Sequence, residues 1–268
     1  MPSSATLRQQ IESDFQHRYP SVLTPSARTI CEVAATGIAP IDELLDGGLP
    51  IGAISEITGP ASSGRTTITQ AFLARRTQEG RACALIDAND TFDPESAVAN
   101  GVSLTHLLWV RCRNTLFEKP SPAVRFTPSD KMQTKEKPWP RLDQAIRATD
   151  LLLQAGGFAA IVLDLAEEAI EHGRRIPLAT WFRFRQAADR TRCSLIVLGK
   201  AAYAQSSAAV VLECQSDRID VAAGTVIRNF NYRARSGRVR FSPFTSIARK
   251  PPASTWTTPA TWNSDKRA

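Results

Sequence analysis

The chain has 268 residues, of which 43% are hydrophobic, and a formal net charge of +7 at pH 7. This length and apolar fraction suffice for one substantial core with short appendages, so we expect a single α/β domain with tails. No apolar run reaches the roughly 18 to 20 residues that span a bilayer, and no basic segment followed by an apolar one opens the chain. We therefore expect a cytoplasmic protein without a membrane partner. The five cysteines lie far apart with no C-x-x-C pair, which predicts neither disulfides nor a metal centre of their own.

Strand and helix patterns alternate along the chain. Residues 1–35 predict a short N-terminal helix, over residues 7–17, and a loop, and residues 36–249 predict the core. Short apolar strands separated by amphipathic helices are typical of a mostly parallel central sheet with helices on both faces. Strands are expected at 53–58, 82–87, 107–110, 159–164, 194–198 and 210–213, and helices at 66–79, 143–155 and 178–191.

Two segments interrupt this alternation. Residues 115–141 are rich in proline and lysine without periodicity, which predicts a mobile insertion. Residues 250–268 are rich in proline, serine and threonine, which predicts a disordered tail carrying Trp256 and Trp262. Because tryptophan is a frequent anchor at interfaces, the tail either docks to a partner or folds back onto its own domain.

Residues 59–67 predict a phosphate-binding loop. They fit the pattern G-x-x-x-x-G-K-[ST] except that Arg65 stands where lysine is expected, and a strand before and a helix after supply the required context. In such loops backbone N–H groups cradle the phosphates, lysine reaches the β and γ phosphates, and the next hydroxyl, here Thr66, ligates magnesium. The alternative is an ordinary surface turn. The expected ATP- and Mg²⁺-binding residues of the loop are Gly59, Pro60, Ala61, Ser62, Ser63, Gly64, Arg65, Thr66 and Thr67.

Several short matches together resemble the ATP-binding core of bacterial RecA recombinase. Besides the loop, they are Thr36-Gly37, Ile41-Asp42, residues 47–52, Glu56-Ile57, Ile86-Asp87-Ala88 and Asp93-Pro94. The resemblance covers about residues 36 to 214 and is dense up to Gly101, and it implies a RecA-like P-loop NTPase core. The compact size and altered site are more similar to the ImuA branch, whose members are accessories of SOS-induced mutagenic translesion synthesis.

Departures from the RecA pattern imply weak ATP binding and at most weak ATPase activity. Asn89 occupies the position of the catalytic glutamate, and asparagine can orient water but cannot take a proton. Asp87 or Asp90 is the nearest carboxylate that could replace it. Ser96 takes the place of the aromatic residue that stacks on adenine. Arg65 keeps the charge of lysine but not its compact shape.

Further matches concern magnesium and DNA. Asp164 matches the acid that holds the hydration shell of magnesium, and its alternative is a simple strand-ending aspartate. Lys200 replaces the glutamine that couples nucleotide to DNA, so it either contacts a γ-phosphate or faces water. Residues 165–177 and 199–208 correspond to shortened DNA-binding loops, and the large C-terminal domain of RecA has no counterpart. The resemblance therefore argues against strand exchange.

The basic residues are concentrated near the C-terminus, where ten lysines and arginines and only two aspartates lie from Arg218 onward. A β-hairpin is expected at 225–244, with strands 225–235 and 238–244 joined by the turn Ser236-Gly237. Its register would place four arginines on one face, and because like charges across a ladder repel, this face predicts an anionic partner, with single-stranded DNA the leading candidate. The alternative is pairing with acids of the body. The arginines are Arg233, Arg235, Arg238 and Arg240, and the acids are Glu167, Glu168 and Glu171.

Three functional hypotheses follow. The first is a non-recombinase accessory factor of translesion synthesis that binds ATP weakly. It would dock to a Y-family polymerase-like subunit and to an error-prone replicative polymerase. These partners, as well as self-association or contact with RecA, are implied by the resemblance alone. The second is an active DNA-dependent ATPase or recombinase, which requires that Arg65 and Asn89 be tolerated. The third is an interaction scaffold with an empty nucleotide pocket.

Overall fold

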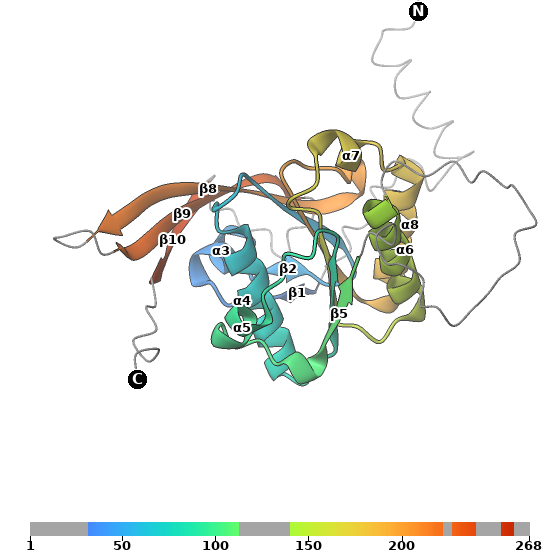
Figure 1. Ribbon diagram of the computed structural model, residues 1–268, viewed down its shortest axis with the longest axis horizontal. Coiled ribbons are helices and arrows are strands. Elements are labelled where there is room, and N and C mark those ends of the chain that lie inside the picture. Colours follow the sequence, from blue (N-terminus) through green and yellow to red (C-terminus); the bar gives the residue numbers. More distant parts are fainter. Residues whose placement is uncertain (1–31, 113–139, 222–226, 240–252, 260–268) are drawn as a thin grey trace, which may run out of the picture.

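The computed structural model describes residues 32–112, 140–221, 227–239 and 253–259. Its framework is an eight-stranded sheet with the order β10-β9-β8-β3-β7-β6-β4-β5 (Figure 1). From β8 to β5 the strands are parallel, and β9 and β10 extend one edge in antiparallel pairing. The strands are β3 (Ile54–Thr58), β4 (Cys83–Asp87), β5 (Leu107–Arg111), β6 (Ala160–Asp164), β7 (Ser194–Gly199), β8 (Ala208–Val221), β9 (Ile227–Val239) and β10 (Ala253–Pro259).

Helices cover both faces of this sheet (Figure 1). On one face lie α3 (Ala39–Leu44), α4 (Arg65–Gln78) and α5 (Pro94–Ala99), and on the other α6 (Pro140–Ala155) and α8 (Leu178–Thr191). Consecutive strand residues alternate between two cores: Leu85 packs with Phe72 of α4, whereas Ile86 packs with Trp181 of α8. This alternation requires strands that are apolar throughout, which is why the sequence shows them as continuous apolar runs. Among the described helices, none combines the length and the apolarity needed to cross a bilayer.

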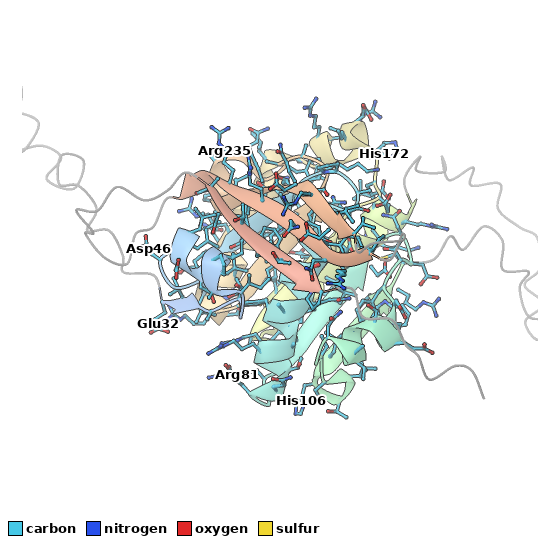
Figure 2. The ribbon with its side chains drawn as sticks, turned by 90° about the vertical axis from the view of Figure 1, so that its left-hand side faces the viewer. Glu32, Asp46, Arg81, His106, His172 and Arg235 are labelled. Atoms are coloured by element: carbon cyan, nitrogen blue, oxygen red, sulfur yellow. The ribbon has the colours of Figure 1, made fainter. Side chains whose placement is uncertain are left out.

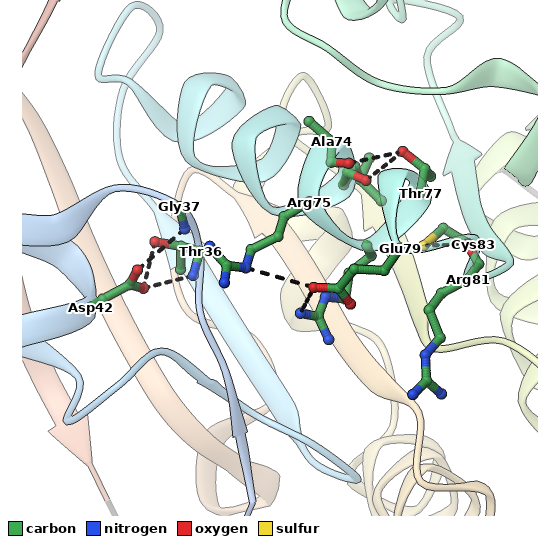
Figure 3. A network of polar contacts seen from close by, with 11 residues as sticks. Thr36, Gly37, Asp42, Ala74, Arg75, Thr77, Glu79, Arg81 and Cys83 are labelled. Carbon is green, nitrogen blue, oxygen red and sulfur yellow. Dashed lines mark hydrogen bonds and ion pairs between the residues drawn. The ribbon is translucent and has the colours of Figure 1, made fainter.

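Short elements complete the described chain. A small separate sheet pairs β1 (Val33–Ala34) with β2 (Leu49–Pro50), and α7 (Ile170–Arg174) follows β6. Two 3-10 turns, η1 (Leu104–His106) and η3 (Gln205–Ser207), precede β5 and β8. The entry to α3 is fixed by Asp42, whose carboxylate accepts hydrogen bonds from Thr36 N and Oγ1 at 2.6 and 2.7 Å and from Gly37 N at 3.2 Å (Figure 3).

The expected hairpin at 225–244 is wrong. Ser236 and Gly237 lie inside β9, and β9 pairs with β8 along its length, with Leu212 opposite Ser236 and Val211 opposite Arg238. Gly237 is thus an extra residue at a register shift rather than part of a turn. The expected strand at 210–213 was too short because β8 continues as a polar, exposed strand that the apolar pattern does not reveal.

The expected disordered tail is wrong for residues 253–259, which form β10. Trp256 lies opposite Tyr232 of β9 and is only 6% exposed, so this tryptophan folds back onto its own domain. The pairing is possible because the threonine-rich run around Trp256 has the β-branched side chains that suit a strand. Trp262, the N-terminal helix at 7–17 and the insertion at 115–141 lie outside the described residues, except that the last two residues of the insertion begin α6.

Candidate functional site

The strand register brings the predicted site residues to one edge of the sheet. Thr58, the last residue before the loop, pairs with Gly199, and Leu198 pairs with Asp164. Asp164 in turn lies opposite Asp87, just before Asn89. These are the carboxyl ends of four neighbouring parallel strands, where ligands of open α/β sheets bind. The loop at 59–67, Asp164 and Asn89 therefore share one edge.

The loop has a backbone that its glycines permit. Gly59 has φ of 152°, and Gly64, the N-cap of α4, has φ of 86°. A Cβ atom at Gly59 would lie 2.2 Å from the carbonyl oxygen of Cys214, so no larger residue fits there. Among the described residues, none accepts a backbone hydrogen bond from Ser62, Ser63 or Gly64. Unsatisfied N–H groups at the start of a helix form a site for an anion.

Side chains of the loop also fit a phosphate group with magnesium. The Oγ atom of Ser63 is buried and has no hydrogen-bond partner among the described residues, so a phosphate oxygen would satisfy it. Thr66 is exposed at the first turn of α4, as a magnesium ligand must be. Within the described ranges, no cluster of three or more His, Cys, Asp or Glu side chains could hold a metal ion by itself. Thr66 and Asp164 would therefore hold Mg²⁺ together with the phosphates, which Mg²⁺ would help to neutralise.

Arg65 makes a contact that the sequence does not reveal. Its side chain is buried, and its Nη1 atom donates a hydrogen bond to the carbonyl oxygen of Gly199 at 2.7 Å. The same oxygen accepts a hydrogen bond from Gly59 N at 3.2 Å. Arg65 thus fastens the loop to the end of β7, and its guanidinium is engaged by the protein backbone.

Asp164 has an environment that favours its protonated form. Burial raises the pKa of this carboxyl to about 6, and the negative charge of Asp87 adds to that effect. A hydrogen bond from Ala166 N at 2.8 Å and the positive charge of Arg65 act in the opposite direction. A cation placed beside Asp164 would stabilise its ionised form, which is the behaviour expected of a carboxylate that helps to hold magnesium.

The two carboxylates nearest to Asn89 are engaged elsewhere. Asp87 is fully buried and accepts hydrogen bonds from the backbone N–H groups of Asn89, Thr91 and Phe92 at 3.2, 3.0 and 2.9 Å. Asp90 forms a bidentate ion pair with Arg111 at 2.6 and 2.7 Å. Neither carboxylate is left to accept a proton from water. The Nδ2 atom of Asn89 is buried without a partner in the described chain.

The segments after β6 and β7 are tied to each other and to the sheet. Lys200 Nζ donates to the carbonyl oxygen of Glu167 at 3.1 Å and lies 3.8 Å from its carboxylate, so this lysine is paired rather than simply hydrated. Glu56 on β3 is fully buried, and its Oε1 accepts from the backbone N–H groups of Tyr203 and Ala204 at 2.5 and 2.9 Å. The chain that follows β7 is therefore held close to the loop.

The predicted arginine face is only partly present. Arg233 and Arg235 are both exposed on β9, and Arg235 lies at the outer surface of the ribbon in Figure 2. Arg233 pairs with Asp217 of β8 at 3.2 Å, whereas the expected acid Glu168 contacts His172 at 3.1 Å. Arg233 and Arg235 therefore share one face, and the acid that pairs with Arg233 lies on the neighbouring strand. The register places Arg238 opposite Val211, and Arg240 lies outside the described residues.

An aromatic pair that sequence reasoning missed packs on the loop. The rings of Tyr232 and Trp256 lie 5.2 Å apart, and a Cβ atom at Gly64 would lie 2.7 Å from Trp256 Cζ2 and 2.9 Å from Tyr232 Cγ. The only signal in the sequence was the tryptophan itself, set among threonines. The aromatic pair joins β10 to Gly64, the N-cap of α4.

A groove of about 510 Å³ opens beside the loop, between α3, α4 and β10. Thr67 and Ala71 of α4 line one wall, and Ile38 and Pro40 line the part next to α3. Residues 255–259 of β10 form another wall, and Gly37 and Asn100 complete the lining. Thr67 belongs to the predicted loop and also lines the groove, so the groove adjoins the end of the loop.

Comparison with known proteins agrees with the RecA resemblance. Residues 4–114 match the family model of the RecA N-terminal domain. Protein RecA of Synechococcus elongatus, and that of a second Synechococcus strain, is 39% identical over 99 residues, which cover 37% of this chain and 28% of each relative. The match thus spans little more than a quarter of these curated relatives.

The fold has a counterpart among solved structures. The crystal structure of the RadB recombinase aligns with a TM-score of 0.52 at 19% sequence identity, over 85% of this chain and 96% of that one. At this identity the likeness shows the fold alone. It confirms the expected RecA-like α/β architecture with a mostly parallel sheet.

Proposed function

We propose that this chain is a RecA-like DNA repair protein that binds Mg·ATP weakly, hydrolyses it slowly or not at all, and serves as an accessory factor in mutagenic translesion synthesis. The observation that carries the proposal is the hydrogen bond from Arg65 to the carbonyl oxygen of Gly199. In a phosphate-binding loop the cationic side chain at this position normally contacts the nucleotide, whereas here the guanidinium is bound to the protein backbone.

Nucleotide binding is supported by the rest of the loop. Its backbone N–H groups lack acceptors in the described chain, Ser63 Oγ is an orphaned buried hydroxyl, and Thr66 is exposed beside it. These groups fit phosphates, but without a free lysine they supply less charge than such loops ordinarily do. Weak affinity follows from that deficit.

Slow hydrolysis is supported by the chemistry around Asn89. A positioned general base contributes about 10²- to 10⁴-fold to the rate, and asparagine cannot supply it. Asp87 and Asp90, the nearest substitutes, are held by three backbone N–H groups and by Arg111, respectively. An attacking water would therefore be oriented without being deprotonated.

Action on DNA is supported by Arg233 and Arg235 on the ribbon formed by β8 and β9, whose exposed guanidinium groups suit a phosphate backbone. The match of residues 4–114 to the RecA N-terminal domain agrees with a role in DNA repair. The polymerase partners, and self-association or contact with RecA, rest on the resemblance to the ImuA branch.

The test is a calorimetric titration with Mg·ATP and a phosphate-release assay with and without single-stranded DNA. We expect binding in the high micromolar range and release at background under both conditions. DNA-stimulated release near one per second that disappears in Asp164→Ala would contradict the accessory function and favour an active ATPase. Absence of binding would leave only the scaffold hypothesis.

The partner is tested with the purified full chain and a Y-family polymerase-like protein in a binding assay. Because residues 253–259 belong to the fold, the informative truncation ends the chain at Pro259 and removes Trp262. We expect reduced capture of the polymerase-like protein by the truncated chain. Equal capture by both chains would show that Trp262 is not the anchor.

A further inference from the structure

A second cavity lies at the edge of the sheet opposite to the phosphate-binding loop. It has a volume of about 320 Å³ and is lined at the amino ends of three strands, by Ala82 before β4, Ala159 before β6 and Ser194 at the start of β7. These strands are five or six residues long, so roughly 15–20 Å separates the cavity from the loop. The cavity is therefore distinct from the candidate nucleotide site.

Three arginines from separate parts of the chain line this cavity. Arg76 lies in the last turn of α4, Arg81 lies between α4 and β4, and Arg192 directly follows α8. Among the described residues of the lining, Glu32 is the only acid, and it pairs with Arg192 at 2.8 Å. The lining therefore carries three positive charges and one negative charge.

The acids nearby do not satisfy all of these guanidinium groups. The side chain of Arg76 is 15% exposed, and its Nη2 donates to Glu79 at 2.7 Å, whereas its buried Nε has no acceptor in the described ranges. Glu79 is shared with Arg75, 3.7 Å away. Arg81 is exposed and has no ion pair within the part of the chain that the structure describes, and its guanidinium points away from Glu79 (Figure 3). Arg76 and Arg81 therefore retain hydrogen-bond donors for a ligand.

The hydroxyl groups of the lining already have acceptors. Ser194 Oγ donates to the carbonyl oxygen of Pro50 at 3.1 Å, and Thr191 Oγ1 donates to a backbone oxygen of α8 at 2.8 Å. Ile51 and Phe158 add half-buried apolar surface. A ligand in the cavity would thus meet arginine donors beside an apolar wall, so a complementary ligand has acceptor oxygens and an apolar part.

We propose that this cavity binds a small organic oxyanion, a carboxylate or phosphate group with an apolar body, through Arg76 and Arg81. Guanidinium groups suit both oxyanions because they can donate two parallel hydrogen bonds to them. The volume lies at the lower end of the range of small-molecule sites, which favours a ligand smaller than a nucleotide. The inference is independent of the proposed function, because the phosphate-binding loop takes no part in it.

The probe is phenylphosphate, which combines an oxyanion with an apolar ring. It is titrated into the full-length chain at constant ionic strength, and binding is followed by ligand-observed NMR. Wild type should bind it with a Kd of about 1 mM or below. Inorganic phosphate, which lacks the ring, should bind more weakly, and benzyl alcohol, which lacks the charge, should not bind. Benzoate separates the two oxyanions: tighter binding than phenylphosphate assigns a carboxylate ligand, and weaker binding a phosphate ester.

Substitution of the arginines tests the site itself. Arg81→Gln should weaken phenylphosphate binding about tenfold through the loss of a charge-assisted contact, and the variant should fold because Arg81 is exposed. Arg76→Gln should act in the same direction. The matched control is Arg75→Gln, because Arg75 precedes Arg76 on the same helix and shares Glu79 but does not line the cavity. This control should leave the Kd unchanged.

Removing the acid of the lining should have the opposite effect. Glu32 neutralises Arg192, so Glu32→Gln should tighten phenylphosphate binding. Glu43→Gln removes the same charge from the exposed side of α3, away from the cavity, and should not change the Kd. Equal tightening in both variants would show that only net charge matters, and would count against a site.

Three further results would overturn the proposal. They are the absence of phenylphosphate binding by wild type, equal binding of benzyl alcohol, and equal losses in Arg75→Gln and Arg81→Gln. Ser63→Ala locates the probe: a loss in this variant but not in Arg81→Gln would assign phenylphosphate to the phosphate-binding loop and refute the cavity site, whereas a loss in Arg81→Gln alone supports it. The titration with Mg·ATP tests the proposed function separately.

Discussion

Arg65 Nη1 donates a buried hydrogen bond to the carbonyl oxygen of Gly199, 134 residues further along the chain, at 2.7 Å. The residue that should serve the nucleotide thus joins the loop to the strand beside it. This hydrogen bond stabilises the fold through an arginine at a position where a lysine would contact the phosphates of a nucleotide more closely.

Arg65→Lys should therefore lower the stability of the protein and raise its affinity for Mg·ATP. Arg65→Lys leaves the Gly199 oxygen with a weaker partner, so we expect a loss of about 1–2 kcal/mol in the free energy of unfolding, measured by urea denaturation. Mg·ATP affinity should rise several-fold, because a compact ammonium can reach the phosphates. Phosphate release should stay at background, because Asn89 remains. Arg75→Lys, on the exposed side of the same helix, is the control and should change none of these quantities.

Asp164 should make stability depend on pH. The folded state keeps the Asp164 proton up to a pKa of about 6, whereas the unfolded chain releases it near the ordinary value of 3.8. Stability from the protonated carboxyl is therefore present at low pH and is lost as the pH rises through about 6. Asp164→Asn is neutral at every pH and keeps the acceptor for Ala166 N, so it should be more stable than wild type above pH 6, by about 3 kcal/mol.

Thermal unfolding of wild type and Asp164→Asn between pH 4 and pH 8 measures this difference. The two curves should converge near pH 4, and a gap that does not depend on pH would refute the assignment. Mg·ATP binding by wild type should weaken as the pH falls below about 6, because a protonated Asp164 does not help to hold magnesium.

Gly64 should tolerate no side chain. In Gly64→Ala the new Cβ would meet Trp256 and Tyr232 at 2.7 and 2.9 Å, in addition to the strain of a positive φ. We expect a loss of about 2–4 kcal/mol in the free energy of unfolding. Gly80→Ala, just beyond the other end of α4, has a similar φ of 70° but nothing within 4 Å of its Cβ, so it should cost only the backbone strain, about 1 kcal/mol. Equal losses in urea denaturation would show that the aromatic pair does not pack on Gly64.

The ribbon arginines should set the salt dependence of DNA binding. In the double variant Arg233→Gln, Arg235→Gln we expect weaker binding of a labelled single strand and a log–log salt slope smaller by about 1, since each lost phosphate contact removes about 0.7 and Asp217 already neutralises part of Arg233. The double variant Arg183→Gln, Arg185→Gln on α8 removes the same charge from another surface. Fluorescence anisotropy from 50 to 300 mM salt gives the slope, and equal slopes for the two variants would assign the effect to net charge alone.

The core and the loop could be predicted from the sequence for physical reasons. Strands buried on both faces must be apolar throughout, so β3, β4, β6 and β7 stand out as short continuous runs, and α8 was expected with its observed bounds. The loop was visible because its glycines and hydroxyls are needed at fixed spacing.

The C-terminal third was harder to predict because other forces shape it. β8 and β9 are exposed over much of their length, so residues 215–220, all polar except Ile219, break the apolar pattern without ending the strand. Ser236-Gly237 has the composition of a tight turn, yet a register shift accommodates it within β9. Arg65 donates to the backbone oxygen of Gly199. Because every residue type has this oxygen, the sequence at position 199 does not indicate the hydrogen bond.

The packing of Trp256 on Gly64 also has a consequence for how the protein is made. During synthesis the phosphate loop emerges early, whereas residues 253–259 leave the ribosome only after most of the chain has been translated. Until then the loop and Tyr232 lack the cover that Trp256 provides, and contacts between segments so far apart form slowly. A growing chain should therefore complete the packing around the loop only after β10 has emerged, and a messenger cut short before β10 would give a product that exposes this surface to chaperones and proteases.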